Sequence, residues 1–232
     1  MKKLKRLVGI ILLLAIVTSV FSGSALAASG SRYFLVADDV TNSGMTQVNT
    51  ICSNLTSLGY PNTYTYLPLP TTLYSNLPNY YVAVVHGHGG PGVIACKQSN
   101  GSSQNLYSAG TNAQVSFSNY VSGALNSVKL TLFITCHSAM GPSNSTSNGF
   151  VATAYNKGAS VSIGFKDDVT AGEWWANYFV NSLSFYSIDS AAYLADANFA
   201  YYFPSVSGSP SSPDNANNQY ILGSKYSFIW NL

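Results

Sequence analysis

Short apolar runs alternate with segments of helical periodicity along most of this chain. Apolar runs that predict strands occupy residues 33–37, 81–85, 130–135 and 161–165, and a weaker run at 63–67 predicts another strand. Residues 45–58 place apolar side chains at helical spacing and stop before Gly59, which is a common residue just after a helix. The pattern therefore predicts that strands and helices alternate.

The remaining segments extend this alternation. Further helices are predicted at 71–77, 113–125, 149–156, 170–185 and 190–199. A hairpin is predicted from 92–97 and 105–108, around the turn Ser99-Asn100-Gly101-Ser102, and polar loops at 143–148 and 205–218. A last strand is predicted at either 219–222 or 227–230.

Strands that alternate with helices over this length predict an α/β fold. The central sheet should be mostly parallel, with helices on both faces. The segment from residue 29 to residue 232 contains no internal repeat and no linker, so we expect one domain there.

The N-terminal segment has the features of a secretory signal peptide. Basic residues at Lys2, Lys3, Lys5 and Arg6 precede an apolar stretch over 7–20, and small residues up to Ala28 offer a cleavage site. A retained membrane anchor is the alternative, but the short apolar core followed at once by a cleavage pattern favours removal. Residues 1–28 are therefore predicted to be a signal peptide, and the mature protein to be secreted and extracellular.

Removal of the signal peptide changes the charge of the chain. Its basic cluster holds four of the ten Lys and Arg residues, so the formal net charge moves from +2 to −2. The remaining chain has no basic cluster of the kind that binds nucleic acid, and no later stretch long enough to span a bilayer. We therefore expect no nucleic-acid partner and no membrane association after cleavage.

The three cysteines allow two interpretations. A disulfide between Cys52 and Cys96 would leave Cys136 as a free thiol in a secreted protein. Alternatively, Cys52 and Cys96 are small buried hydrophobic side chains, which is a common fate of free cysteine. Sequence alone does not decide between them.

Two of the predicted strands end in chemically reactive residues. The run at 81–85 is followed by His86-Gly87-His88-Gly89-Gly90, and the run at 130–135 is followed by Cys136-His137-Ser138. Strand ends in an open α/β sheet converge on one crevice even when they are far apart in sequence. A thiol and an imidazole that meet there form a nucleophile and its base. The sequence therefore predicts a cysteine hydrolase.

The two motifs together resemble those of the caspase-like cysteine peptidases, the clan that includes legumains, gingipains and metacaspases. In that clan one hydrophobic block ends in His-Gly and a second ends in the nucleophilic Cys. The strings Gly87-His88-Gly89 and Cys136-His137-Ser138 are most similar to those of metacaspases. The resemblance covers roughly residues 33–199 in the order of elements, but only the two short motifs are specific.

This resemblance implies a caspase-like three-layer sandwich and a cysteine-type endopeptidase that acts on polypeptides. Cys136 would be the nucleophile, and His88 the base, with His86 as the alternative base. The backbone N–H groups of Gly89 (or Gly87) and Cys136 would form the oxyanion hole. No cofactor or metal is implied, and we expect a monomer.

The chain departs from its apparent relatives just before the nucleophile. Metacaspases and legumains carry an acidic residue there for substrate recognition, whereas this chain has Ile134 and Thr135. Asp167 and Asp168 could supply a substitute acid, or they could lie at the N-terminus of the next helix, which we favour. Trp174 could line a substrate groove, although a Trp on an amphipathic helix is more often part of the core.

Two other functions fit the same residues. His86 and His88, with His137 and the nearby acids, could bind zinc, and Cys136 would join them as a thiolate ligand. A catalytically inactive caspase-like domain could instead serve as an extracellular binding module, since a fold does not guarantee an activity. An esterase is disfavoured because the chain has no Gly-x-Ser-x-Gly elbow.

Overall fold

The computed structural model describes residues 31–36, 42–60, 62–66, 69–97, 102–110 and 114–231. The predicted signal peptide at 1–28 lies outside the described residues and stays a prediction. Among the helices within the described ranges, none is long and apolar enough to cross a membrane.

Among the described residues, six strands form a central sheet in the order β2-β1-β3-β7-β8-β9. Their bounds are β1 Ser31–Val36, β2 Asn62–Tyr66, β3 Tyr80–His86, β7 Leu130–Ile134, β8 Val161–Phe165 and β9 Gln219–Gly223. Every neighbouring pair is parallel except β8 with β9. The prediction of an α/β fold with a mostly parallel sheet is therefore confirmed.

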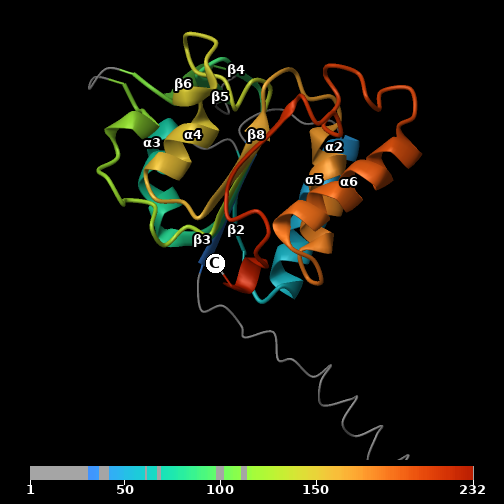
Figure 1. Cartoon of the computed structure of the whole chain (residues 1–232). Helices are drawn as coiled ribbons and strands as arrows, with labels where there is room; N and C mark the ends of the chain where they lie inside the picture. Colours follow the sequence, from blue (N-terminus) through green and yellow to red (C-terminus); the bar gives the residue numbers. More distant parts are fainter. Residues whose placement is uncertain are drawn as a thin grey trace, which may run out of the picture.

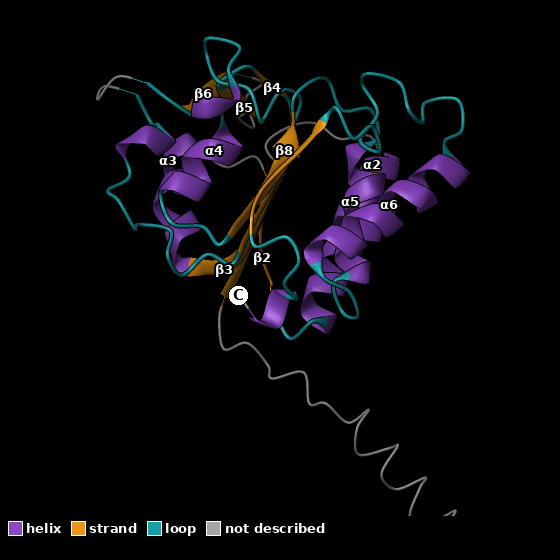
Figure 2. Ribbon diagram, in the orientation of Figure 1, coloured by secondary structure: helices purple, strands orange, loops and turns teal. Residues whose placement is uncertain are grey.

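Helices lie on both faces of this sheet (Figures 1 and 2). One face carries α2 (Asn42–Ser57), α5 (Gly172–Ser182) and α6 (Ile188–Tyr202), and the other carries α3 (Pro70–Asn76) and α4 (Phe150–Asn156). Short 3-10 turns complete the helical segments, at Leu77–Asn79, Phe117–Asn119, Thr146–Asn148 and Ile229–Asn231. The arrangement is compatible with a three-layer sandwich.

Side chains that alternate along the central strands belong to two separate hydrophobic cores. In β3, Val82 and Val84 belong to the core under α2, α5 and α6, whereas Ala83 and Val85 belong to the core under α3 and α4. Strands that are buried on both faces read as continuous apolar runs, which is why they were visible in the sequence. The sheet therefore separates the hydrophobic core on the α5 side from the hydrophobic core on the α4 side.

The predicted hairpin is present as part of a smaller sheet. Here β4 (Gly89–Gly90), β5 (Val93–Lys97) and β6 (Ser103–Tyr107) pair in antiparallel fashion. Because β4 begins just after β3 ends, this small sheet lies at the end of the central sheet where the parallel strands finish (Figure 1).

The predicted helix at 113–125 is wrong. The described part of this segment, from residue 114, forms a 3-10 turn at Phe117–Asn119 and further turns. Ser116 caps that short turn by accepting a hydrogen bond from the N–H of Ser118, and Gly123 has a φ of 79°, which an α-helix does not contain. The stacking of Tyr120 on Tyr74, with ring centroids 4.2 Å apart, then fixes the segment on α3.

Other predicted elements need only small changes. The last strand is the first alternative, 219–222, because β9 spans Gln219–Gly223. Helix α5 ends at Ser182, three residues before the predicted end at residue 185, and α6 begins at Ile188 behind the Ser187 cap. The hydroxyl of Ser187 accepts a hydrogen bond from the N–H of Ser190, which explains this earlier start.

No disulfide links the described cysteines. Cys52 packs against the core on the α5 side of the sheet, and Cys96 lies in the core on the α4 side. The central sheet lies between them. Of the two interpretations, the structure therefore has the one in which both are hydrophobic side chains.

Candidate functional site

The register between β3 and β7 brings the two motifs together. His86, the last residue of β3, pairs with Ile134, the last residue of β7, and the N–H of Gly87 donates to the Ile134 carbonyl at 3.3 Å. His88 and Cys136 each lie two residues beyond this pair. Both residues therefore lie at the same edge of the sheet, at equivalent positions after their strands.

Gly89 packs directly against the nucleophile candidate. A Cβ atom built on Gly89 would lie 2.7 Å from the carbonyl oxygen of Cys136 and 3.1 Å from the Cβ of Thr135. Real side chains do not approach backbone so closely, so only glycine fits here without a shift. The backbone after His88 is thus in contact with the backbone of Cys136.

The thiol of Cys136 is partly buried against the loop at 166–171, which joins β8 to α5. The N–H of Val169 donates to Cys136 Sγ at 3.3 Å. Burial raises the pKa of Cys136 and the nearby Asp168 carboxylate raises it further, while the Val169 N–H opposes this increase. The thiol is therefore mainly protonated at neutral pH, and the Val169 hydrogen bond favours its thiolate form.

His137 faces the 166–171 loop. It adopts the left-handed region, with a φ of 55°, and its N–H donates to the Asp167 carbonyl at 3.0 Å. Its Nδ1 lies 3.1 Å from the Lys166 carbonyl, and its Nε2 lies 3.3 Å from Asp168 Oδ1. Both ring nitrogens therefore have neighbours in this loop, which fits a residue that holds the loop in place.

His86 lies beside an acid that the sequence did not single out. Its Nε2 is 3.6 Å from Glu173 Oε2, in the first turn of α5. Burial alone would raise the pKa of Glu173, but the hydrogen bond and the charge of His86 outweigh it and lower that pKa. Only 8% of His86 is exposed, and its Nδ1 has no hydrogen-bond partner among the described residues.

The two histidines therefore differ in environment. His86 is buried and points to α5, whereas His88 is exposed at the strand end. The backbone carbonyl of His88 accepts a hydrogen bond from the N–H of Ala95 at 3.0 Å, so the hairpin fixes the backbone of His88. Of the two, His88 is the one that a substrate can approach from solvent.

Asp168 lies beside the candidate nucleophile, and the favoured prediction that Asp167 and Asp168 cap α5 is wrong. The N-cap residue of that helix is Ala171, which has no side-chain cap. The Oδ1 of Asp167 instead accepts the N–H of Asp168 at 2.9 Å. Trp174 is only partly buried, packs against the core on the α5 side and meets the ring of Phe203 at 5.5 Å.

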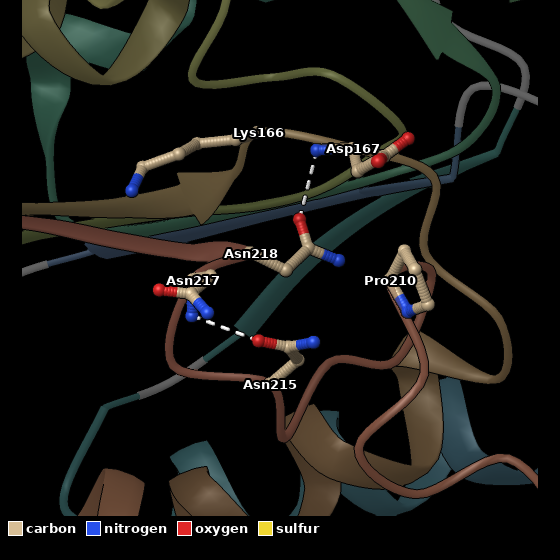
Figure 3. A pocket seen from close by; sticks show the side chains of 6 residues that line it. All are labelled: Lys166, Asp167, Pro210, Asn215, Asn217 and Asn218. Atoms are coloured by element: carbon tan, nitrogen blue, oxygen red, sulfur yellow. Dashed lines mark hydrogen bonds between the residues drawn. The ribbon is translucent and has the colours of Figure 1, made fainter.

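A polar hollow adjoins this loop (Figure 3). Its volume is about 260 Å³, and it is lined by Lys166, Asp167, Pro210, Asn215, Asn217 and Asn218. Asn218 was not a candidate in the sequence, where it is one of several polar residues in a predicted loop. In the structure its side chain forms hydrogen bonds with the backbone of Asp167 and of Asp168.

The predicted zinc ligands are not assembled in the described part of the chain. The residues close enough to share a cation there are His137, Asp167 and Asp168, whose ligand atoms lie within 4.8 Å of one another. His86 instead faces Glu173, and Cys136 Sγ faces the Val169 N–H. Because both aspartates are exposed, and exposed carboxylates often cluster without a cation, we do not interpret this group as a metal centre.

A scan against models of protein families gives no match for this chain. A search of curated proteins gives no match either. The resemblance to caspase-like peptidases therefore depends on the two sequence motifs.

Proposed function

We propose that the chain is a secreted cysteine-type endopeptidase with a caspase-like three-layer sandwich fold. The observation that supports this best is the pairing of His86 with Ile134, which places His88 and Cys136 at matching positions beyond two neighbouring parallel strands. The contact of Gly89 with the Cys136 carbonyl brings the two turns together. A nucleophile and a base on adjacent strand ends are the minimum equipment for acyl transfer.

The proposed mechanism begins with a protonated thiol, because burial raises the pKa of Cys136. As the sulfur attacks the peptide carbonyl carbon, His88 accepts the thiol proton and an S–C bond forms. His88 then gives the proton to the leaving amine as the C–N bond breaks. Water hydrolyses the thioester in the second half of the reaction, and His88 again takes and returns a proton.

The developing oxyanion needs hydrogen-bond donors close to the sulfur. The N–H of Gly87 is already bonded to the Ile134 carbonyl, so it is a poor candidate. We assign this role to the N–H groups of Gly89 and Cys136, which belong to the two turns that touch. Substrate backbone can approach this segment because Gly89 carries no side chain.

The proposal is tested by digestion of a peptide library with wild type, Cys136→Ala and His88→Ala. The expected result is cleavage by the wild type, none by Cys136→Ala, and cleavage by His88→Ala that is slower by roughly 100-fold or more. Equal cleavage by the wild type and Cys136→Ala would assign the activity to another group or to a contaminant. Secretion is tested separately, by recovery of the chain from culture medium with its N-terminus near residue 28.

A second function is supported by one observation. The Asp168 carboxylate lies near Cys136 and raises its pKa, which is the opposite of what activates a nucleophilic thiol. That environment favours a catalytically inactive extracellular binding module. If Cys136 reacts with iodoacetamide no faster than a small-molecule thiol of the same pKa, and the library stays intact, this second function is the correct one.

A further inference from the structure

The loop at 166–171 forms one wall of the candidate site, and its backbone contacts the nucleophile. Val169 donates its N–H to Cys136 Sγ, and the carbonyl of Asp167 accepts the N–H of His137. A displacement of this backbone would remove the N–H that favours the thiolate. What holds the loop therefore affects the chemistry of Cys136.

Asn218 holds this loop through both ends of its side-chain amide. Its Oδ1 accepts the N–H of Asp167 at 2.8 Å, and its Nδ2 donates to the carbonyl of Asp168 at 2.9 Å. Figure 3 shows the Asn218 amide directed at the backbone of Asp167. Because Asp167 offers a donor and Asp168 an acceptor, the orientation of the amide is fixed by its partners.

The backbone of Asn218 adds to this attachment. Its carbonyl accepts the N–H of Lys166 at 2.8 Å, and its Nδ2 also donates to the carbonyl of Ser212 at 3.2 Å. Only 3% of Asn218 is exposed, so these hydrogen bonds are made away from water. A buried amide that satisfies backbone donors and acceptors at once is costly to replace.

We propose that Asn218 is a positioning residue for Cys136: it clamps the backbone of Asp167 and Asp168 so that the Val169 N–H is directed at the sulfur. The role in peptide cleavage rests on the proposed function above. The role in setting the reactivity of the thiol does not, because alkylation of Cys136 is measured without a substrate.

The isosteric variant Asn218→Asp tests the clamp. A carboxylate still accepts the N–H of Asp167, but it places an oxygen against the carbonyls of Asp168 and Ser212 where the amide donated. Asn217→Asp is the matched control, because Asn217 is exposed, lines the same hollow and adds the same charge one residue away. Within the described residues, the side chain of Asn217 makes none of the hydrogen bonds by which Asn218 holds the 166–171 loop.

The measurement is the rate of Cys136 alkylation by iodoacetamide as a function of pH, resolved by peptide mass mapping. Loss of one hydrogen bond to the thiolate should shift the midpoint for Asn218→Asp upward by about one pH unit, which slows alkylation near pH 7 roughly tenfold. Asn217→Asp should stay close to wild type. An unshifted Asn218→Asp, or equal shifts in both variants, would overturn the proposal.

The same variants separate this inference from the proposed function. On a cleaved peptide, Asn218→Asp should lower kcat with little change in KM, because Asn218 acts through Cys136. A wild type without peptidase activity but with an upward shift in Asn218→Asp would refute the peptidase and support the clamp. A wild type with peptidase activity together with an unshifted Asn218→Asp would support the peptidase and refute the clamp.

A measurement on the wild type covers the case in which Asn218→Asp does not fold. Amide hydrogen exchange at Asp167 should be slow, because its N–H is bonded to the buried Asn218 side chain. Exchange of the Asp167 amide at the rate of an unstructured peptide would show that the clamp does not form in solution.

Discussion

The Cα of Gly89 lies against the carbonyl oxygen of Cys136, so closely that a Cβ on Gly89 would come within 2.7 Å of it. The two residues are far apart in sequence: Gly89 begins β4, shortly after β3, and Cys136 lies in the turn after β7. Because the obstacle is backbone and not a flexible side chain, it cannot move aside without displacing the nucleophile. Gly90, the next residue, has no neighbour within 4 Å of its corresponding position.

Comparison of Gly89→Ala with Gly90→Ala therefore distinguishes the effect of this backbone contact from the effect of replacing a glycine with alanine. We expect Gly89→Ala to push the two turns apart and to reduce kcat/KM by about 100-fold, since small displacements of catalytic groups have effects of this order. Gly90→Ala should keep near-wild-type activity. Steady-state kinetics on one peptide substrate checks both, and equal activities would show that the contact is not needed for catalysis.

His88 and His86 should differ in what they contribute. His88→Ala should lower kcat by roughly 100-fold or more through loss of the general base, with an unchanged urea midpoint. His86→Ala should lower the free energy of unfolding by about 1–3 kcal/mol, because it leaves the Glu173 carboxylate without its partner.

The double variant His86→Ala with Glu173→Ala is the control for this second effect. It removes both charges, so it should be more stable than the sum of the single variants predicts. If His88→Ala keeps full activity and His86→Ala loses it without loss of stability, the base is His86, and Glu173 is its orienting acid.

The two strands that carry this site could be predicted from the sequence, because they depend on the local pattern of apolar residues. Strands β3 and β7 are buried on both faces, so both read as continuous apolar runs, and the reactive residues follow their ends directly. Parallel strands in one sheet then place both ends on one edge. The positions of His88 and Cys136 follow from these two facts alone.

The partners of these residues could not be predicted in the same way. Glu173 lies in α5 and contacts His86, which is over 80 positions earlier in the sequence. Asn218 directly precedes β9 and acts on Cys136, which is also over 80 positions earlier. Neither lies in a motif, and the N–H of Val169 has no sequence signature at all. The wrong helix at 113–125 has a related cause, because the contact of Tyr120 with Tyr74 overrides local periodicity.

The state of the thiols gives a third prediction. Without a disulfide between Cys52 and Cys96, the denatured protein should titrate three thiols with no reductant present, and dithiothreitol should leave the melting temperature unchanged. In the native protein Cys136 should react first, because burial raises the pKa of Cys52 to about 11 and Cys96 is fully buried. A reductant-sensitive melting temperature would contradict the opposite placement of Cys52 and Cys96.

Asp196 in α6 gives a prediction about stability and pH. Burial raises the pKa of Asp196 to about 6, although Trp175 Nε1 and Gln219 Nε2 donate to its Oδ1 at 2.7 and 2.6 Å and oppose the increase. Asp214 adds a further increase by charge repulsion. The native state therefore holds a proton on Asp196 more tightly than the unfolded chain does.

The sign of the pH effect follows from this. Stability from the protonated Asp196 is fully present below its unfolded pKa near 3.8 and is lost as the pH rises through about 6. Asp196→Asn keeps an oxygen that accepts from Trp175 and Gln219 but never becomes charged. It should therefore be more stable than wild type at pH 8, and this advantage should disappear below pH 4.

Urea denaturation of both proteins at pH 8 and pH 4 measures the difference. The control is Asp189→Asn, which removes an exposed carboxylate that faces Lys225 and has no buried environment to lose. It should change the urea midpoint little at either pH, since exposed ion pairs contribute little. If Asp196→Asn is less stable than wild type by the same amount at both pH values, the Asp196 carboxylate is not disfavoured by burial. Its role would then be that of an ordinary hydrogen-bond acceptor between α5, α6 and β9.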